Sequence, residues 1–377
     1  MGANMAQKKS LILDLHIPYG ITPIKYISGF QLMGANEEKN AYLMAMMREV
    51  MAYEGQLDDY EIRAVHLSGG AATVMKPDLL GQLLATVRKK LPVAAHAEVS
   101  FDALPNTIGT PSLSGISVGQ PNRAELMMRS YRDEELRALQ CPFELQHVKN
   151  AILFFDKFHL NNLGFTVNYG IPGQTLRNWE YTINACSRMR PSHITVLPLA
   201  VTDAEGMPDE EGRFEMFSRA DALLREAGYL HYGSGLFCLP GHENMFEVLR
   251  ANGCEILAMG LNGSSMLDGY YTRNTNNLRL YIRNAGNLEG QTAEAAQISA
   301  DAAQMHYAAG RMTMEQGLSL ESFEKRFGVP LPVSILSALK QAEELGLAES
   351  AEGGFVPTIR GLFKPDAIGK LISNARL

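Results

Sequence analysis

Two carboxylates and a pair of glycines stand where predicted β-strands end. Asp14 lies in the apolar run LILDL, Asp102 follows AEVSF, and the pair Gly69–Gly70 comes just after AVHL. Burying an unpaired carboxylate costs several kcal/mol, so each aspartate needs a partner or water. Asp14 and Asp102 therefore either form salt bridges, for which Lys25 is a candidate, or contact a ligand. The glycine pair either makes a tight turn or faces that ligand.

Two tyrosines and three histidines are further candidates for chemistry. His16, Tyr19 and Tyr26 belong to the loop HIPYGITPIKYISGF, while His231 and His242 occur much later in the chain. His16 either orients the loop through a hydrogen bond or takes part in catalysis. The tyrosines either pack in the core or do chemistry, and the later histidines either line a substrate cavity or are structural.

The cysteines exclude a metal–thiolate centre. The chain has 4 cysteines, and no two of them have the spacing of metal ligands. Because iron–sulfur clusters need clustered thiolates, we expect neither an iron–sulfur cluster nor another metal site. Reduced thiols of this kind are typical of a cytoplasmic protein.

Composition narrows the class of protein. The 377 residues are 46% hydrophobic and 20% charged, with a net charge of −7. No basic tract indicates nucleic acid, and no run approaches the roughly 18 apolar residues of a membrane span. The first residues, MGANMAQKKS, lack the apolar core of a signal peptide. We expect a soluble cytoplasmic protein that acts on a small molecule.

The elements that must position these residues alternate between strands and helices. Such alternation predicts an α/β fold with a parallel sheet, in which ligands gather at the carboxyl ends of the strands. The predicted strands are Leu11–Leu15, Ala64–Leu67, Ala97–Phe101, Gly115–Gly119, Gly164–Tyr169 and His193–Leu197. The predicted helices include Lys39–Tyr53, Pro77–Leu91, Glu134–Leu160 and Leu176–Met189.

The alternation of strand-like and helical segments ends near residue 291. This change predicts one domain over 1–290 and a smaller one over 291–377. A predicted helix over Ala293–Met312 precedes LSLESFEKRFGV, a second helix, and the hairpin-like GGFVPTIRGL. This order is typical of a winged-helix-like module. Because the segment has no basic excess, a structural docking role is favoured over DNA binding.

Several segments, taken in order, resemble one known family. They are LDLHIPYG, HLSGGAAT, EVSFDALP, NYGIPGQT and LAMGLNGSSMLDGYYTRNTNNLRLY. Together they resemble the oxygen-independent coproporphyrinogen III oxidases and the related haem chaperones, which are radical-SAM proteins. The resemblance implies a partial (β/α)6 barrel followed by a small C-terminal domain.

The departures from that family concern its cofactors. The three cysteines that hold the family's cluster fall on Gly20, Ile24 and Ile27, which offer no ligand atom. The resemblance therefore implies a protein without an iron–sulfur cluster, which cannot generate a radical from S-adenosylmethionine (SAM).

The family's SAM contacts are partly altered. The resemblance places an aromatic residue at Asp14, a threonine at Ala71 and a glutamate at Asp102, while Gly69 and Gly70 remain. These five residues are candidates for cofactor binding.

Three further family positions are changed. The family has an acid at Thr166 and an arginine at Cys141, and its fourth strand ends in a glutamine. That glutamine corresponds to Gln120 if GISVG is the strand, or to Arg129 in a gapless alignment. We prefer Gln120, because NRAELMMRSYRDEELRAL has a helical pattern.

The first functional hypothesis is an enzyme that binds SAM and transfers a methyl or similar group by polar chemistry. Such transfer needs an oriented nucleophile in line with the sulfonium. Asp14 and Asp102 would hold the SAM ammonium, and Arg129 or Lys25 its carboxylate. Tyr19, Tyr26 and His231 are the candidate catalytic groups.

Two alternatives come from other classes. The chain could bind haem or another tetrapyrrole without catalysis, with His16, His231 or His242 as axial ligand. It could also be a pseudoenzyme that pairs with an active relative.

Overall fold

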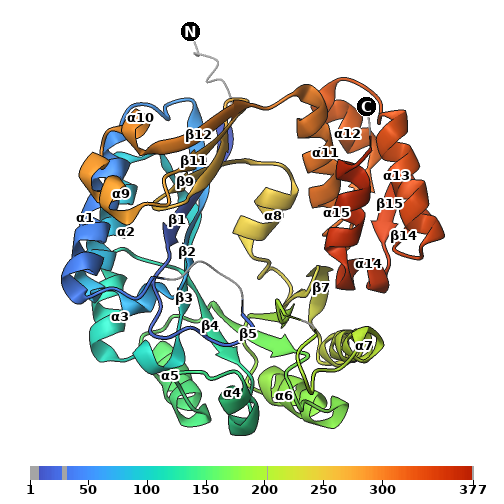
Figure 1. Ribbon diagram of the computed structural model, residues 1–377, viewed down its shortest axis with the longest axis horizontal. Helices are drawn as coiled ribbons and strands as arrows, with labels where there is room; N and C mark the ends of the chain where they lie inside the picture. Colours follow the sequence, from blue (N-terminus) through green and yellow to red (C-terminus); the bar gives the residue numbers. More distant parts are fainter. Residues whose placement is uncertain (1–7, 28–31, 202, 376–377) are drawn as a thin grey trace.

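The computed structural model describes residues 8–27, 32–201 and 203–375. Its main feature is an open sheet of 12 strands in the order β12-β11-β10-β9-β1-β2-β3-β4-β5-β6-β8-β7. The run from β9 to β6 is parallel. The predicted α/β fold with a partial, unclosed barrel is therefore confirmed (Figure 1).

The parallel strands and the helices between them alternate as predicted. The strands are β1 (Lys9–Ile17), β2 (Tyr60–Gly69), β3 (Val93–Ala103), β4 (Arg123–Arg129), β5 (Leu163–Tyr169), β6 (His193–Pro198) and β9 (Glu255–Met259). The intervening helices are α1 (Asn36–Ala52), α2 (Pro77–Lys90), α3 (Thr110–Ser117), α4 (Asp133–Ala138), α5 (Leu145–Lys157), α6 (Leu176–Arg188), α7 (Glu210–Glu226) and α8 (Met245–Ala251). Short 3-10 turns, η1 (Ala72–Val74) and η2 (Pro105–Thr107), follow β2 and β3.

The two ends of the sheet are antiparallel. One end carries β7 (Leu230–Gly233) and β8 (Leu236–Cys238), and the other carries β10 (Ser264–Leu267), β11 (Tyr270–Asn274) and β12 (Thr292–Gln297). The short helices α9 (Leu278–Asn284) and α10 (Leu288–Gln291) connect β11 to β12.

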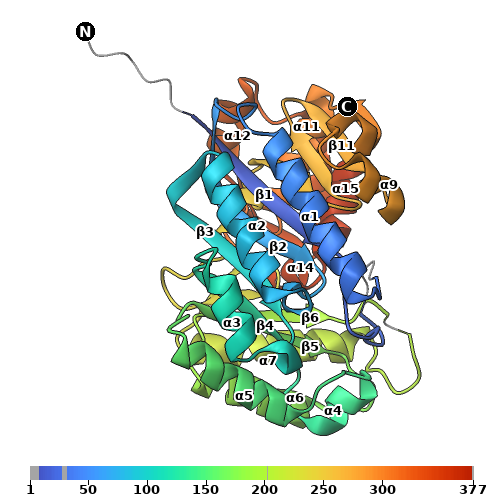
Figure 2. The same ribbon diagram turned by 90° about the vertical axis from the view of Figure 1, so that its left-hand side faces the viewer.

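Each parallel strand has an apolar face and a polar face. In β1, Leu11, Leu13 and Leu15 are fully buried in the main core. Helices α1, α2 and α3 cover that convex side (Figure 2). On the concave side, Ile12 packs with Ala64 and Phe246 under α8, which lies inside the curve of the sheet (Figure 1). Further along the strands the same concave face carries polar residues, beginning with Asp14 and His66.

The C-terminal part has its own hydrophobic cluster, which includes Tyr307, Phe323 and Leu339. It contains α11 (Ala300–Arg311), α12 (Leu320–Phe327), α13 (Val333–Glu344), α14 (Ile359–Phe363), α15 (Pro365–Ser373) and a sheet of β13 (Leu318–Ser319), β15 (Gly354–Pro357) and β14 (Ala348–Ala351). A bidentate ion pair between Arg360 and Glu211, at 3.0 and 2.9 Å, fastens this part to α7.

Four predicted elements are wrong. Gly115–Gly119 is not a strand, because α3 covers Thr110–Ser117. The segment 122–139, whose pattern we read as helical, contains β4. Glu134–Leu160 is two helices, interrupted near Gln140, whose φ is 55°. The helix expected over Ala293–Met312 begins only at Ala300, since strand β12 precedes it. In β4 the cause is tertiary: its arginine and glutamate pair with each other inside the sheet.

No helix within the described ranges is long and apolar enough to cross a membrane.

Candidate functional site

Polar side chains from successive strands meet on the concave face of the sheet. Asp14 of β1 pairs in register with His66 of β2, which pairs with Ser100 of β3. Two residues further along β3, Asp102 pairs with Glu125 of β4. Registered neighbours in a parallel sheet point to the same side, so these residues share one surface. As expected from the strand pattern, Asp14 and Asp102 are brought to one face.

Asp14 is a half-buried carboxyl, and no countercharge among the described residues is in contact with it. Its Oδ1 is buried and has no hydrogen-bond partner among the described residues. Burial raises the pKa of Asp14 from 3.8 to about 6, against the lowering effects of a hydrogen bond with Ser68 and the charge of Arg250. Lys25, one candidate partner for Asp14, forms no ion pair with it in the described part of the chain; the exposed Lys25 ammonium lies 4.6 Å from the Tyr26 ring centre.

Asp102 lies beside a neutral histidine. Burial raises the pKa of Asp102 well above its usual value, the charge of Glu125 raises it further, and Arg129 lowers it. His66 Nε2 is 3.9 Å from Asp102 Oδ2. Burial and nearby arginine charges lower the pKa of His66 to about 4. At neutral pH this contact therefore joins a carboxyl to an uncharged imidazole and is not an ion pair.

Arg129 completes what we call the rim cluster: Asp14, Asp102 and Arg129. Arg129 ends β4 with a φ of 63°, next to an irregularity in the β4–β5 register. Its Nη1 donates to Asn168 Oδ1 at 3.4 Å, but its buried Nε has no partner in the described part of the chain. The preference for Gln120 as the residue ending the fourth strand is wrong, since Gln120 is exposed in the turn before β4.

Deeper on the concave face lies a second group, the floor network: Glu98, Arg123, Glu125 and His193. Arg123 is fully buried and its guanidinium lies 3.0 Å from Glu125 and 3.4 Å from Glu98. His193 Nδ1 is 3.7 Å from Glu125, and burial together with Arg123 lowers the pKa of His193. Sequence reasoning missed this network, although the alternation of charged and apolar residues in RAELMMR is its signal.

The glycine turn after β2 is held by the chain itself. The N–H groups of Gly70 and Ala71 donate to the carbonyls of Ile17 and Tyr19 at 2.9 and 3.2 Å. A Cβ at Gly70 would lie 2.1 Å from the Tyr19 carbonyl oxygen. Gly69 has a φ of 98°, which favours glycine. These contacts support the tight-turn interpretation of the pair.

The loop after β1 contributes to the core. Ile24 is buried in the main hydrophobic cluster and Ile27 packs against it. Together with Gly20 they offer no ligand atom, so these residues do not fit an iron–sulfur cluster. Tyr19 is also fully buried, with its hydroxyl 3.3 Å from Glu38. The structure thus favours core packing for Tyr19.

The remaining predicted residues are dispersed. Thr166 of β5 is buried and in register with Thr195 of β6. His16 stays at the concave face, where its Nδ1 is 3.3 Å from Ser68 Oγ. His231 is fully buried against α7, with its Nδ1 2.7 Å from Asp221 and its ring stacked on Phe237. The structure does not bring it to the rim cluster. His242 is exposed.

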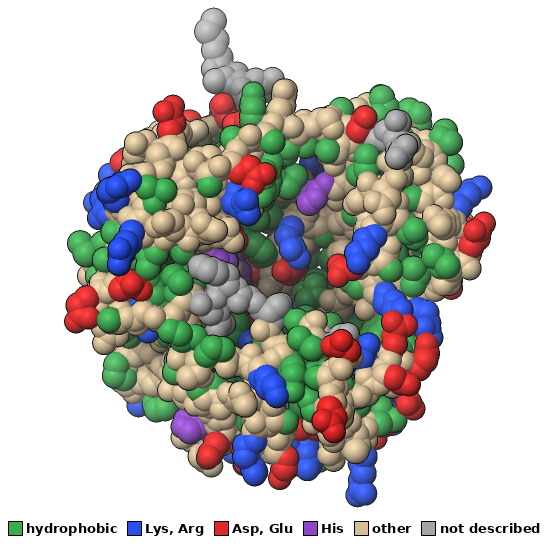
Figure 3. Space-filling view, in the orientation of Figure 1, with side chains coloured by type: hydrophobic (Ala, Val, Ile, Leu, Met, Phe, Trp, Pro, Cys, Tyr) green, Lys and Arg blue, Asp and Glu red, His purple; other side chains and the backbone are tan. Residues whose placement is uncertain are grey.

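A cavity of about 740 Å³ opens between β6, α8 and the C-terminal helices α11 and α15, and the rim-cluster residues are not part of its lining. We call it the interdomain cavity. Its lining includes Leu197, Glu247, Arg250, His306, Met314 and Lys370. Two of these lining residues influence the rim cluster electrostatically: the charge of Arg250 lowers the pKa of Asp14 and the charge of Glu247 raises it. Figure 3 shows the central hollow with charged and histidine side chains at its walls.

Sequence reasoning did not single out His306 or Arg250. His306 lies on α11 and Arg250 on α8, and neither belongs to a recognisable motif. Only the docking of the C-terminal part against the barrel brings them together.

Comparisons with known proteins give the relationship. No protein-family model matches the chain. The haem chaperone HemW of Escherichia coli is 21% identical over 247 residues, covering 63% of this chain and 65% of that protein. The oxygen-independent coproporphyrinogen III oxidase of the same organism is 21% identical over 306 residues, covering 73% and 65%. Each alignment thus spans about two thirds of the curated relative.

The solved structure of the E. coli coproporphyrinogen III oxidase HemN, described as a radical SAM enzyme, matches with a TM-score of 0.83. That match covers 98% of this chain and 92% of HemN at 17% identity. The chain therefore has the radical-SAM fold of HemN. Its homologues are the haem chaperone HemW and the oxygen-independent coproporphyrinogen III oxidase, which confirms the resemblance seen in the sequence.

Proposed function

We propose that this protein binds a tetrapyrrole such as haem in the interdomain cavity, without iron–sulfur or radical chemistry. The proposal rests mainly on the cavity itself. Its volume of about 740 Å³ lies within the range of about 300–1,000 Å³ of pockets that bury a small organic ligand.

The lining offers the groups that a haem needs. His306 and Met314 provide an imidazole nitrogen and a thioether sulfur, both common axial ligands. Lys370 lines the cavity and is a candidate to pair with a propionate carboxylate, whereas Arg250 already pairs with Glu247 at 2.5 Å. Glu247 and Asp366 also line the cavity, so only part of the wall favours an anion.

Two further observations support this function. Five of the similar proteins are named haem chaperones, from Escherichia coli, Lactococcus lactis, Buchnera aphidicola, Synechocystis and Haemophilus influenzae. Gly20, Ile24 and Ile27 do not fit a cluster, which argues against radical turnover but leaves ligand binding intact.

A haemin titration followed by its Soret band tests the proposal. We expect one saturable site, and His306→Ala should weaken binding by about tenfold, equal to about 1.4 kcal/mol. The control is His242→Ala, because His242 is exposed and outside the cavity lining. Equal affinity in wild type and His306→Ala, or a loss only in His242→Ala, would contradict the assignment.

A second candidate function is the polar transfer of a methyl or similar group from SAM. The observation that favours it is the rim cluster, where Asp14 Oδ1 and Arg129 Nε are buried without partners among the described residues. These atoms are suited to the ammonium and carboxylate of an amino-acid-bearing ligand. Since Tyr19 is a core residue and His231 lies against α7, the nucleophile would belong to the substrate.

A further inference from the structure

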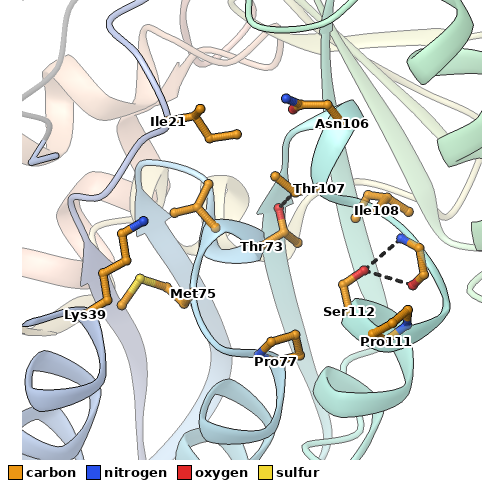
Figure 4. Close-up of a pocket in the computed structure, with 12 residues that line it drawn as sticks. Ile21, Lys39, Thr73, Met75, Pro77, Asn106, Thr107, Ile108, Pro111 and Ser112 are labelled. Carbon is orange, nitrogen blue, oxygen red and sulfur yellow. Dashed lines mark hydrogen bonds between the residues drawn. The ribbon is translucent and has the colours of Figure 1, made fainter. Parts of the chain in front are cut away.

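A separate hollow lies at the rim of the barrel where α1, α2 and α3 begin (Figure 4). We call it the Lys39 pocket. Its volume is about 400 Å³, and a neighbouring hollow of about 450 Å³ shares Lys39, Val74, Met75 and Pro77 with it. Neither hollow includes Asp14, Asp102 or Arg129. The pocket is therefore distinct from the site described above.

Lys39 gives the pocket a positive charge. It is the single charged residue in the described lining, and its side chain reaches the pocket from α1 (Figure 4). Within the described ranges, no hydrogen bond or ion pair engages its ammonium group. Because a half-buried ammonium without a partner gains from an anion, the pocket selects negative charge.

The helix termini act in the same direction. Helices α1, α2 and α3 begin at Asn36, Pro77 and Thr110, and Asn36, Pro77 and Gly109 line the two hollows. The amino-terminal end of a helix carries partial positive charge. Three such ends beside one ammonium strengthen the preference for an anion.

Asn106 supplies an independent sign of a ligand. Its Nδ2 donates to the Pro142 carbonyl at 2.9 Å, whereas its Oδ1 is buried and has no partner among the described residues. Buried acceptors normally accept a hydrogen bond, so we expect a ligand to donate an N–H or O–H to this oxygen. The neighbouring hydroxyls are satisfied within the protein: Thr107 Oγ1 lies 2.7 Å from the Leu104 carbonyl and 2.6 Å from Thr73 Oγ1, and Thr73 Oγ1 accepts from the Leu104 N–H at 3.2 Å.

We propose that the Lys39 pocket binds a small organic anion that also carries an O–H or N–H donor. The anionic group pairs with Lys39, and the donor satisfies Asn106 Oδ1. The apolar body of the ligand packs against the apolar lining residues, of which Ile21 lies between Lys39 and Asn106 (Figure 4).

Three matched probes test this chemistry by titration calorimetry. 4-Hydroxyphenylacetate has the anion and the donor, 4-hydroxyphenylacetamide lacks the charge, and phenylacetate lacks the hydroxyl. We expect the first to bind most tightly. Losing the charge should weaken binding by about ten- to a hundred-fold, and losing the donor by about tenfold.

The variant Lys39→Met locates the site. It should remove the preference for the acid over the amide while leaving the melting curve of the free protein unchanged, because the ammonium has no partner among the residues that the structure describes. Lys340→Met, on the exposed surface of α13, should keep that preference.

Three results would overturn the proposal. The first is no binding by any probe at millimolar concentration, and the second is equal affinities in wild type and Lys39→Met. The third is loss of the preference in Lys370→Met instead, which would place the anion in the interdomain cavity.

Discussion

The floor network and the rim cluster lie on the same concave face, but the charged residues of the floor pair with one another, whereas those of the rim do not. In the floor, Arg123 lies within 3.4 Å of both Glu98 and Glu125. In the rim, no ion pair between described residues joins Asp14 or Arg129 to a partner. Burying an unpaired charge opposes folding. The paired side chains of the floor are therefore explained by their structural role, whereas the unpaired side chains of the rim indicate that a ligand binds there.

The largest effect is expected from breaking the floor. Arg123→Met leaves Glu98 and Glu125 buried without their countercharge, and should lower the free energy of unfolding by about 3–5 kcal/mol. The exposed Arg137→Met is the control, with an expected change of less than about 0.5 kcal/mol. Urea denaturation measures both. Equal stability of the two variants would show that the floor is not a structural network.

The glycine turn should show the second largest effect. Gly70→Ala places a Cβ 2.1 Å from the Tyr19 carbonyl oxygen and should destabilise the protein by about 1–3 kcal/mol. Gly369→Ala is the matched control, because a Cβ there meets nothing within 4 Å. A normal melting temperature for Gly70→Ala would contradict the close packing of the loop on the turn.

Asp14→Asn tests the rim, and unlike the two substitutions above it should raise stability at neutral pH. The folded-state pKa of about 6 lies above the ordinary 3.8, so the folded protein binds more protons than the unfolded chain between about pH 4 and 6. Stability contributed by Asp14 is therefore present at low pH and lost as the pH rises through 6, by up to about 3 kcal/mol.

The variant should remove this pH dependence and raise stability at pH 7. Melting curves from pH 4 to 8 measure it. A variant that is less stable than wild type at pH 7 would mean that Asp14 has a structural partner after all.

Binding measurements sharpen the same contrast. If the rim holds the ammonium of SAM or S-adenosylhomocysteine, Asp14→Asn should weaken binding by about ten- to a hundred-fold, since a charge-assisted hydrogen bond is worth about 1.5–3 kcal/mol. Calorimetric titration decides this. Absence of heat in wild type at millimolar ligand removes the transferase candidate.

The sequence was sufficient for the positions of Asp14 and Asp102, because alternation along a parallel strand determines which side chains share a face. It failed at Gln120 and Arg129, since the buried charges of β4 resemble the exposed face of a helix until their partners are known. It also failed for His231, which the stacking on Phe237 and the contact with Asp221 hold against α7. The place of His306 in the cavity could not be predicted from the sequence, because it depends on how the C-terminal helices dock against the barrel.

The most direct test of the account is a melting experiment on protein purified without oxygen and checked for iron, with haemin, SAM and S-adenosylhomocysteine added separately. A ligand that binds only the folded protein raises the melting temperature by mass action. The account predicts protein without acid-labile sulfide, in which any iron belongs to haem, and whose melting temperature rises with haemin, with a smaller rise in His306→Ala. Stoichiometric acid-labile sulfide together with iron in the purified protein, or no shift with haemin at any concentration, would contradict it.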